Sequence, residues 1–217
     1  GSHNPKDYNG FKMVLKNKPF FGKDIQNLGK KAQFGSDIGM NGNMKCISLD
    51  EKYIKEILTP LSKSVNLKDK KIIWDCGNGA TGDLIKKIVK LIPCQSTVLY
   101  SEIDGNFPNH HPDPSNENNL IKLKQEMKNQ NADFGFAFDG DGDRLAVINN
   151  KLQLIAGDIL TTFLAQSISD KKNPIILDVK SSQKCKQFLE ELGYKVIIWK
   201  TGHSHIKNKM KKINSKF

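Results

Sequence analysis

From about residue 70 onward, short apolar runs alternate with longer stretches in which apolar side chains recur at helical spacing. Short apolar runs bounded by polar residues predict buried strands, whereas spacings of three and four residues predict amphipathic helices. Strands are predicted at 72–74, 97–100, 134–138, 145–148, 175–179 and 196–199, and helices at 84–92, 116–130, 159–168, 185–192 and 203–212. This alternation predicts an α/β fold of tandem domains, with mainly parallel mixed sheets covered by helices.

The chain before residue 50 has a different pattern. It is polar and rich in glycine, with a single short strand predicted at 11–15. Such a segment is too small to bury a core by itself. We therefore expect residues 1–50 to be the C-terminal part of a truncated first domain. Residues 51–153 then form a second domain, entered through a helix at 49–61, and residues 154–217 an incomplete third.

Composition places the chain among ordinary globular proteins, with 37% hydrophobic and 26% charged residues. No apolar run approaches the roughly 18 residues that span a bilayer, so we expect no membrane association. The four cysteines are scattered, without the spacing of a metal site or of a compact disulfide framework. Reduced thiols and a cytoplasmic location are the simplest interpretation. Because the chain begins with Gly1, we infer that its N-terminus has been cut or processed.

The formal net charge of +11 is compatible with nucleic acid, an anionic membrane or a phosphorylated substrate as a partner. Nearly all the basic residues are lysines, and they are scattered rather than interleaved with aromatic residues. This distribution argues against nucleic-acid binding. Arg144 is the single arginine of the chain, and it directly follows a cluster of three aspartates.

That cluster is the strongest chemical signal, the hexapeptide DGDGDR at 139–144, which follows the apolar run at 134–138. Asp139, Asp141 and Asp143 alternate with glycines, so a tight loop can turn several carboxylate oxygens towards one point. Hard divalent cations bind such oxygen ligands. Loops after the carboxyl ends of parallel strands are also where α/β proteins bind ligands.

Three metal chemistries can use this hexapeptide. An EF-hand loop requires glycine at its sixth position and glutamate at its twelfth, which here are Arg144 and Asn150, so that hypothesis fails. A haloacid-dehalogenase-like phosphatase would use Asp139 as its nucleophile. The fit is partial, because Asp143 occupies a position where such enzymes usually carry Thr or Val. The third possibility is a loop that holds Mg²⁺ beside a phosphorylated side chain from elsewhere.

The N-terminal segment GSHNPKDYNGFK at 1–12 offers such a side chain. Its first three residues also resemble a cloning scar. The Asn-Pro and Tyr-Asn-Gly-Phe-Lys that follow favour a loop that presents the hydroxyl of Ser2. His3 and Lys12 are then near enough in sequence to manage charge and protons.

Together, SHNPKDYNGFK and DGDGDR resemble the α-D-phosphohexomutases, and within them the bacterial phosphomannomutase/phosphoglucomutase branch. The resemblance continues in family order through DCGNG at 75–79, DGNFPNHHPDP at 104–114, DVK at 178–180 and KTGHS at 200–204. It covers essentially the whole chain.

The resemblance implies a role for each site residue. Ser2 would carry the phosphate, and Asp139, Asp141 and Asp143 would hold Mg²⁺ together with an oxygen of the phosphoserine. His3 and Lys12 would act beside Ser2 in catalysis, with Lys12 as general acid or base. The substrate would be bound by Arg144, Lys180 and His203. The reaction would interconvert hexose 1-phosphates and 6-phosphates through a 1,6-bisphosphate, and glucose or mannose 1,6-bisphosphate would be the activator of a monomer.

Relative to this family, we expect the chain to be a fragment that lacks both ends, including a fourth domain and the loop that recognises the sugar. The fragment alone would then be inactive, and the choice between mannose and glucose stays open. Two other hypotheses remain: the phosphatase with Asp139 as nucleophile, and a non-catalytic Lys-rich protein that binds an anionic polymer.

Overall fold

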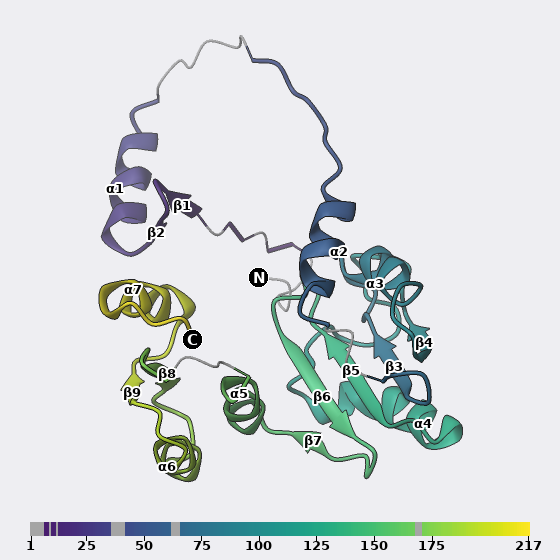
Figure 1. The fold of residues 1–217 in the computed structure, drawn as a ribbon. Coiled ribbons are helices and arrows are strands. Elements are labelled where there is room, and N and C mark those ends of the chain that lie inside the picture. The colour runs from purple at the N-terminus through teal and green to yellow at the C-terminus, as the bar shows by residue number, and fades with distance from the viewer. Residues whose placement is uncertain (1–6, 9, 12, 36–41, 62–65, 168–170) are drawn as a thin grey trace. The chain divides into compact units, whose positions relative to one another are not determined.

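The computed structural model describes residues 7, 8, 10, 11, 13–35, 42–61, 66–167 and 171–217 (Figure 1). The chain divides into two compact units. Unit 1 is built on Met44–Ile155, and unit 2 combines Phe11–Asn43 with Ala156–Phe217. Each unit is described by itself below. No helix of the described residues is both long enough and apolar enough to cross a bilayer.

Unit 1 contains a five-stranded mixed sheet, drawn from blue to green in Figure 1. Its strands are β3 (Lys71–Asp75), β4 (Gln95–Leu99), β5 (Phe134–Phe138), β6 (Leu145–Asn149) and β7 (Leu154–Ile155), in the order β4-β3-β5-β6-β7. The central strand β3 pairs in parallel with β4 and β5, whereas β6 and β7 continue the sheet antiparallel. The carboxyl ends of β3, β4 and β5 therefore lie at the same edge of the sheet.

Helices pack on both faces of this sheet. They are α2 (Asp50–Leu58), α3 (Gly82–Ile88) and α4 (Ile121–Gln130), the last preceded by a 3₁₀ turn at Glu117–Leu120. Ile73 and Ile148 pack with α4, whereas Trp74 packs with the residues of α2 and α3. This division follows from the alternation of side chains along a strand, which sends neighbouring residues to opposite faces.

Unit 2 has two small sheets. Its elements are β1 (Met13–Leu15), β2 (Lys18–Phe20), α1 (Lys23–Ala32), α5 (Gly157–Ala165), β8 (Ile175–Asp178), α6 (Gln183–Glu191), β9 (Val196–Trp199) and α7 (His203–Ile213). Strands β8 and β9 are parallel, and β1 and β2 form an antiparallel hairpin. Ile175, Leu177 and Leu189 are buried in the core that β8 shares with α6.

The predicted α/β architecture is confirmed, and the strands β5 and β9 have the predicted bounds. The expectation of a single short strand before residue 50 is wrong, because β2 and the ten-residue helix α1 also lie there. Helix α1 carries only Ile25, Leu28 and Ala32 as apolar residues, has a glycine inside it and buries none of its side chains. These three residues recur at helical spacing, so the sequence carried a signal for this helix that the prediction missed.

Candidate metal centre and the loops that support it

The metal loop, residues 139–144, leaves the sheet at the carboxyl end of β5. One carboxylate oxygen from each of Asp139, Asp141 and Asp143 lies within 4.8 Å of the others. Asp139 is buried at the base of the loop, and the other two side chains are exposed. Three closely spaced hard oxygen ligands, with two of them open to water, suit a cation such as Mg²⁺ that keeps part of its hydration shell. The side chains present therefore fit the ion that the sequence predicts.

Hydrogen bonds to Asp139 close the loop on itself. The backbone N–H of Arg144 donates to Oδ1 of Asp139 at 3.0 Å, and the N–H of Gly142 donates to the Asp139 carbonyl at 3.0 Å. The Arg144 guanidinium has its Nε 4.0 Å from Oδ2 of Asp139 and is 49% exposed. An ion pair that long and that exposed is weak. The arginine therefore adds positive charge beside the carboxylates, and this weak ion pair does not fix its side chain in one position.

A glycine turn, residues 76–82, packs directly against the metal loop. The N–H of Ala80 donates to the carbonyl of Gly140 at 2.8 Å. A Cβ added at Gly79 would lie 2.7 Å from the same carbonyl oxygen and 2.8 Å from Cα of Gly140. The two backbones thus touch with no room for a side chain between them. This approach explains why position 79 is a glycine.

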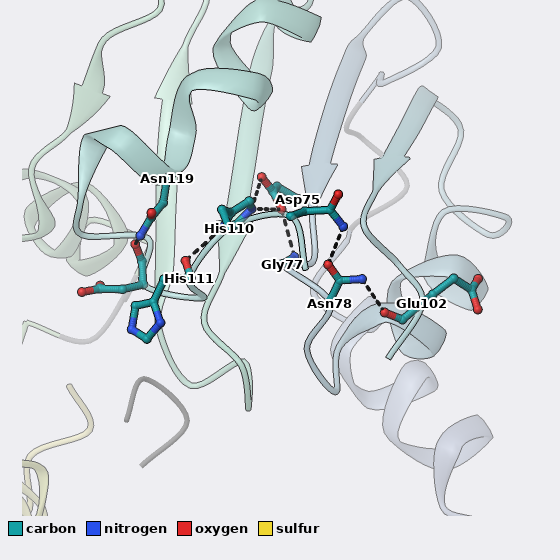
Figure 2. A network of polar contacts seen from close by, with 9 residues as sticks. Asp75, Gly77, Asn78, Glu102, His110, His111 and Asn119 are labelled. Carbon is teal, nitrogen blue, oxygen red and sulfur yellow. Dashed lines mark hydrogen bonds and ion pairs between the residues drawn. The ribbon is translucent and has the colours of Figure 1, made fainter. Parts of the chain in front are cut away.

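Asp75, the last residue of β3, is fully buried beneath this turn and forms an ion pair with His110 (Figure 2). Nε2 of His110 lies 3.1 Å from both carboxylate oxygens of Asp75, and Oδ1 also accepts the N–H of Gly77 at 2.9 Å. Nδ1 of His110 lies 2.9 Å from the carbonyl oxygen of His111. Both ring nitrogens face acceptors, so the contacts are all satisfied only when the ring is a doubly protonated imidazolium.

The pKa of His110 is accordingly raised above its ordinary value of 6.5. Its hydrogen bond to Asp75 is the largest cause, and the charge of that carboxylate and the carbonyl of His111 act in the same direction. Burial of the ring opposes them. The hydrogen bonds outweigh desolvation and shift the equilibrium of His110 towards its charged form.

Asn78 joins the glycine turn to the loop that follows β4, as Figure 2 shows. The residue is 5% exposed. Its Nδ2 donates to the carbonyl of Glu102 at 2.8 Å, and its Oδ1 accepts from Nδ2 of Asn109 at 2.7 Å. The backbone of Asn78 also donates to Tyr100 and accepts from Asp104. Asn78 has a φ of 57°, in the left-handed region that asparagine tolerates better than most residues.

Cys76 is fully buried next to this network. Burial raises the pKa of its thiol to about 12. A thiol that stays protonated in this way cannot serve as a nucleophile at neutral pH. Cys76 is therefore a core residue.

Comparisons with known proteins place these loops in a family. The protein-family model for phosphoglucomutase/phosphomannomutase, alpha/beta/alpha domain II, matches residues 51–152. The family model for alpha/beta/alpha domain III matches residues 156–217. The chain belongs to the phosphoglucomutase/phosphomannomutase family. The resemblance identified from its motifs is thus confirmed.

Individual members of the family agree. A phosphomannomutase/phosphoglucomutase from Pseudomonas syringae pv. tomato is 39% identical over 215 residues, which are 98% of this chain and 45% of that protein. A phosphoglucomutase from Neisseria gonorrhoeae is 39% identical over 219 residues, with 98% and 46% covered. A crystal structure of a family protein from Burkholderia thailandensis has a TM-score of 0.86 at 36% identity, over 98% of this chain and 46% of that one. The chain spans about half the length of the relatives it matches.

Two further predicted site residues of this chain lie far from the metal loop in sequence. Lys180 and His203, both exposed, follow the parallel strands β8 and β9 in unit 2. Asp178 joins these two loops, because its Oδ1 accepts from the N–H of Lys180 at 2.8 Å and from Oγ1 of Thr201 at 2.9 Å.

Ser2, His3 and Lys12 lie outside the described residues. Sequence reasoning did not assign a role to Asp75, although an aspartate at the end of an apolar run before a glycine turn is a detectable signal.

Proposed function

We propose that the complete protein carrying this chain is a magnesium-dependent phosphohexomutase. It would interconvert the 1-phosphate and 6-phosphate of mannose, glucose or both. The observation that carries the proposal is the cluster of Asp139, Asp141 and Asp143 in a chain that belongs to the phosphoglucomutase/phosphomannomutase family. The names of the relatives support both sugars, since some are called phosphoglucomutases and others phosphomannomutase/phosphoglucomutases.

In this proposal Ser2 carries the phosphate between the two ends of the sugar. Asp139, Asp141 and Asp143 hold the cation, with one ligand from the phosphoserine. Bound Mg²⁺ supplies a positive charge that polarises phosphoryl oxygens. Phosphoryl transfer depends mainly on in-line positioning and on neutralisation of charge.

The remaining site residues would serve those two demands. Lys12 and His3 would lie beside Ser2, where Lys12 exchanges a proton with the attacking or leaving oxygen. Arg144, Lys180 and His203 would bind the phosphorylated sugar. The first transfer would make a 1,6-bisphosphate, which would reorient in the site and return its other phosphate to Ser2. Added glucose or mannose 1,6-bisphosphate would accordingly activate a dephosphorylated enzyme.

The phosphatase hypothesis receives no support from the family models and relatives that match, which are mutases. A monomer in the cytoplasm is a further part of the proposal. The cytoplasmic location is supported by free cysteines at the described positions 46, 76, 94 and 185.

Phosphate mapping by mass spectrometry tests the carrier serine. The complete protein is incubated with Mg²⁺ and glucose 1,6-bisphosphate, digested and mapped. We expect an acid-stable phosphate on Ser2 and loss of mutase activity in Ser2→Ala. An acid-labile, hydroxylamine-sensitive phosphate on Asp139, with phosphatase activity retained in Ser2→Ala, would instead establish the phosphatase.

A further inference from the structure

We infer that Asp75, Asn78 and His110 are positioning residues, which press the glycine turn against the metal loop and so set the affinity for the divalent cation. The inference deepens the proposed function and rests on it in one respect: the metal loop must bind a cation. None of the three residues is among those predicted to touch metal or substrate.

The first step is the anchor at the end of β3. Asp75 has no exposed surface, and its carboxylate is held by His110 and by the N–H of Gly77. Removing one partner of a buried ion pair leaves an uncompensated charge, which is much more costly than losing a surface pair. The side chain of His110 is 13% exposed, and the edge-on ring of Tyr100, centred 5.4 Å away, limits its freedom further. The loop that carries His110 is therefore clamped onto the glycine turn.

The second step is the anchor formed by Asn78. Its side-chain amide donates to the carbonyl of Glu102 and accepts from Asn109, so the beginning and the middle of the loop after β4 are tied to the same residue. Buried polar networks of this kind are rigid when every member is satisfied. The turn is thus held from two sides, by a charge at Asp75 and by an amide at Asn78.

The third step leads from the turn to the metal loop. Ala80 donates to Gly140, and Gly79 touches the Gly140 backbone without space for a methyl group. Gly140 is the residue between the two carboxylates Asp139 and Asp141. A shift of the glycine turn therefore moves the backbone that spaces the cation ligands. Residues that orient metal ligands from outside typically affect affinity by about 10-fold to 100-fold.

The competing interpretation is that the network only stabilises the fold. In that case its loss would lower the melting temperature without changing metal binding by the protein that remains folded. Cation affinity, measured at a temperature where each variant is folded, separates the two roles. It is also a readout that does not depend on turnover.

The test titrates Mn²⁺ and Mg²⁺ into the complete protein by calorimetry, with circular dichroism to establish folding. We expect His110→Gln to weaken cation affinity by about 10-fold, because glutamine carries no positive charge to compensate the buried carboxylate of Asp75. Asp75→Asn should weaken cation affinity to a similar extent. The double variant should bind the cation no more weakly than the single variant with the lower affinity, because both substitutions remove the same contact.

Two variants serve as controls. His111→Gln changes the neighbouring exposed histidine and keeps its backbone carbonyl, so cation affinity should stay within about twofold. Ile148→Val loosens the buried core of the same sheet, and it should lower the melting temperature without a change in cation affinity.

Asn109→Ala provides a second route if substitutions at the buried pair prevent folding. Asn109 is exposed and contributes a single bond to Asn78, so this variant should fold and bind the cation several-fold more weakly. Unchanged affinity in both His110→Gln and Asn109→Ala would overturn the inference. Absence of cation binding by the unsubstituted protein would contradict the proposed function itself, so the two failures are distinguishable.

Discussion

At the scale of single residues, the charge state of His110 is the most consequential feature of the described site. Its two ring nitrogens face a carboxylate and a carbonyl, so only the imidazolium satisfies both. Buried carboxylates are rarely tolerated without such a partner. The pair of Asp75 and His110 therefore couples the folding of this edge of the sheet to protonation.

This coupling predicts a pH dependence of stability. The folded-state pKa of His110 is raised above 6.5, so its contribution is fully present below about 6.5 and is lost as the pH rises through the folded value. The groups that face the ring are the Asp75 carboxylate, the Tyr100 ring and the carbonyl of His111. Burial raises the pKa of Tyr100 above its ordinary 10.0, so it stays neutral throughout this range.

The measurement is urea unfolding of the unsubstituted protein and of His110→Gln across the range from about pH 6 to pH 9. We expect the difference in unfolding free energy between them to be largest at the acid end and to shrink towards the alkaline end. A difference that stays constant over the range would contradict a charged His110.

At the scale of elements, the site depends on how closely the turns after β3 and β5 approach each other. Parallel pairing of these two strands brings their carboxyl ends to one edge, and the backbones of Gly79 and Gly140 then meet directly. Such an approach leaves no space that a small rearrangement of side chains could open, because backbone lies on both sides.

Gly79→Ala should therefore destabilise the protein by about 1–3 kcal/mol, as other overpacking substitutions do, and should weaken cation binding. Gly105→Ala is the matched control, since a Cβ at Gly105 has no neighbour within 4 Å. Chemical denaturation of both variants gives the comparison. Equal stability of the two would show that the turns separate more easily than their contact implies.

At the scale of the whole molecule, the proposed roles are divided between the two units. Unit 1 carries the metal loop and Arg144, whereas Lys180 and His203 belong to unit 2. The chain also spans about half the length of its relatives. Activity is therefore a property to be tested on the complete protein, whereas the three proposed cation ligands all lie in unit 1.

Cation binding by the folded state alone should stabilise the protein. At a free Mg²⁺ concentration of 100 times the Kd, the gain in unfolding free energy is about 2.7 kcal/mol. The melting temperature of the unsubstituted protein should therefore be higher with Mg²⁺ than after chelation with EDTA. In Asp141→Asn the two melting temperatures should be the same. A shift of the same size in that variant would place the cation elsewhere.

The sequence alone determined the strands β5 and β9, most helices and the convergence of the three carboxylates in the loop after β5. Those features depend on local periodicity and on short runs such as DGDGDR, in which the neighbours along the chain settle the outcome. Only the tertiary structure decided that Asp75 pairs with His110, 35 positions away, and that Gly79 touches Gly140. The physical reason is that such contacts depend on which strands lie side by side, and the order β4-β3-β5 brings together loops that are far apart in sequence.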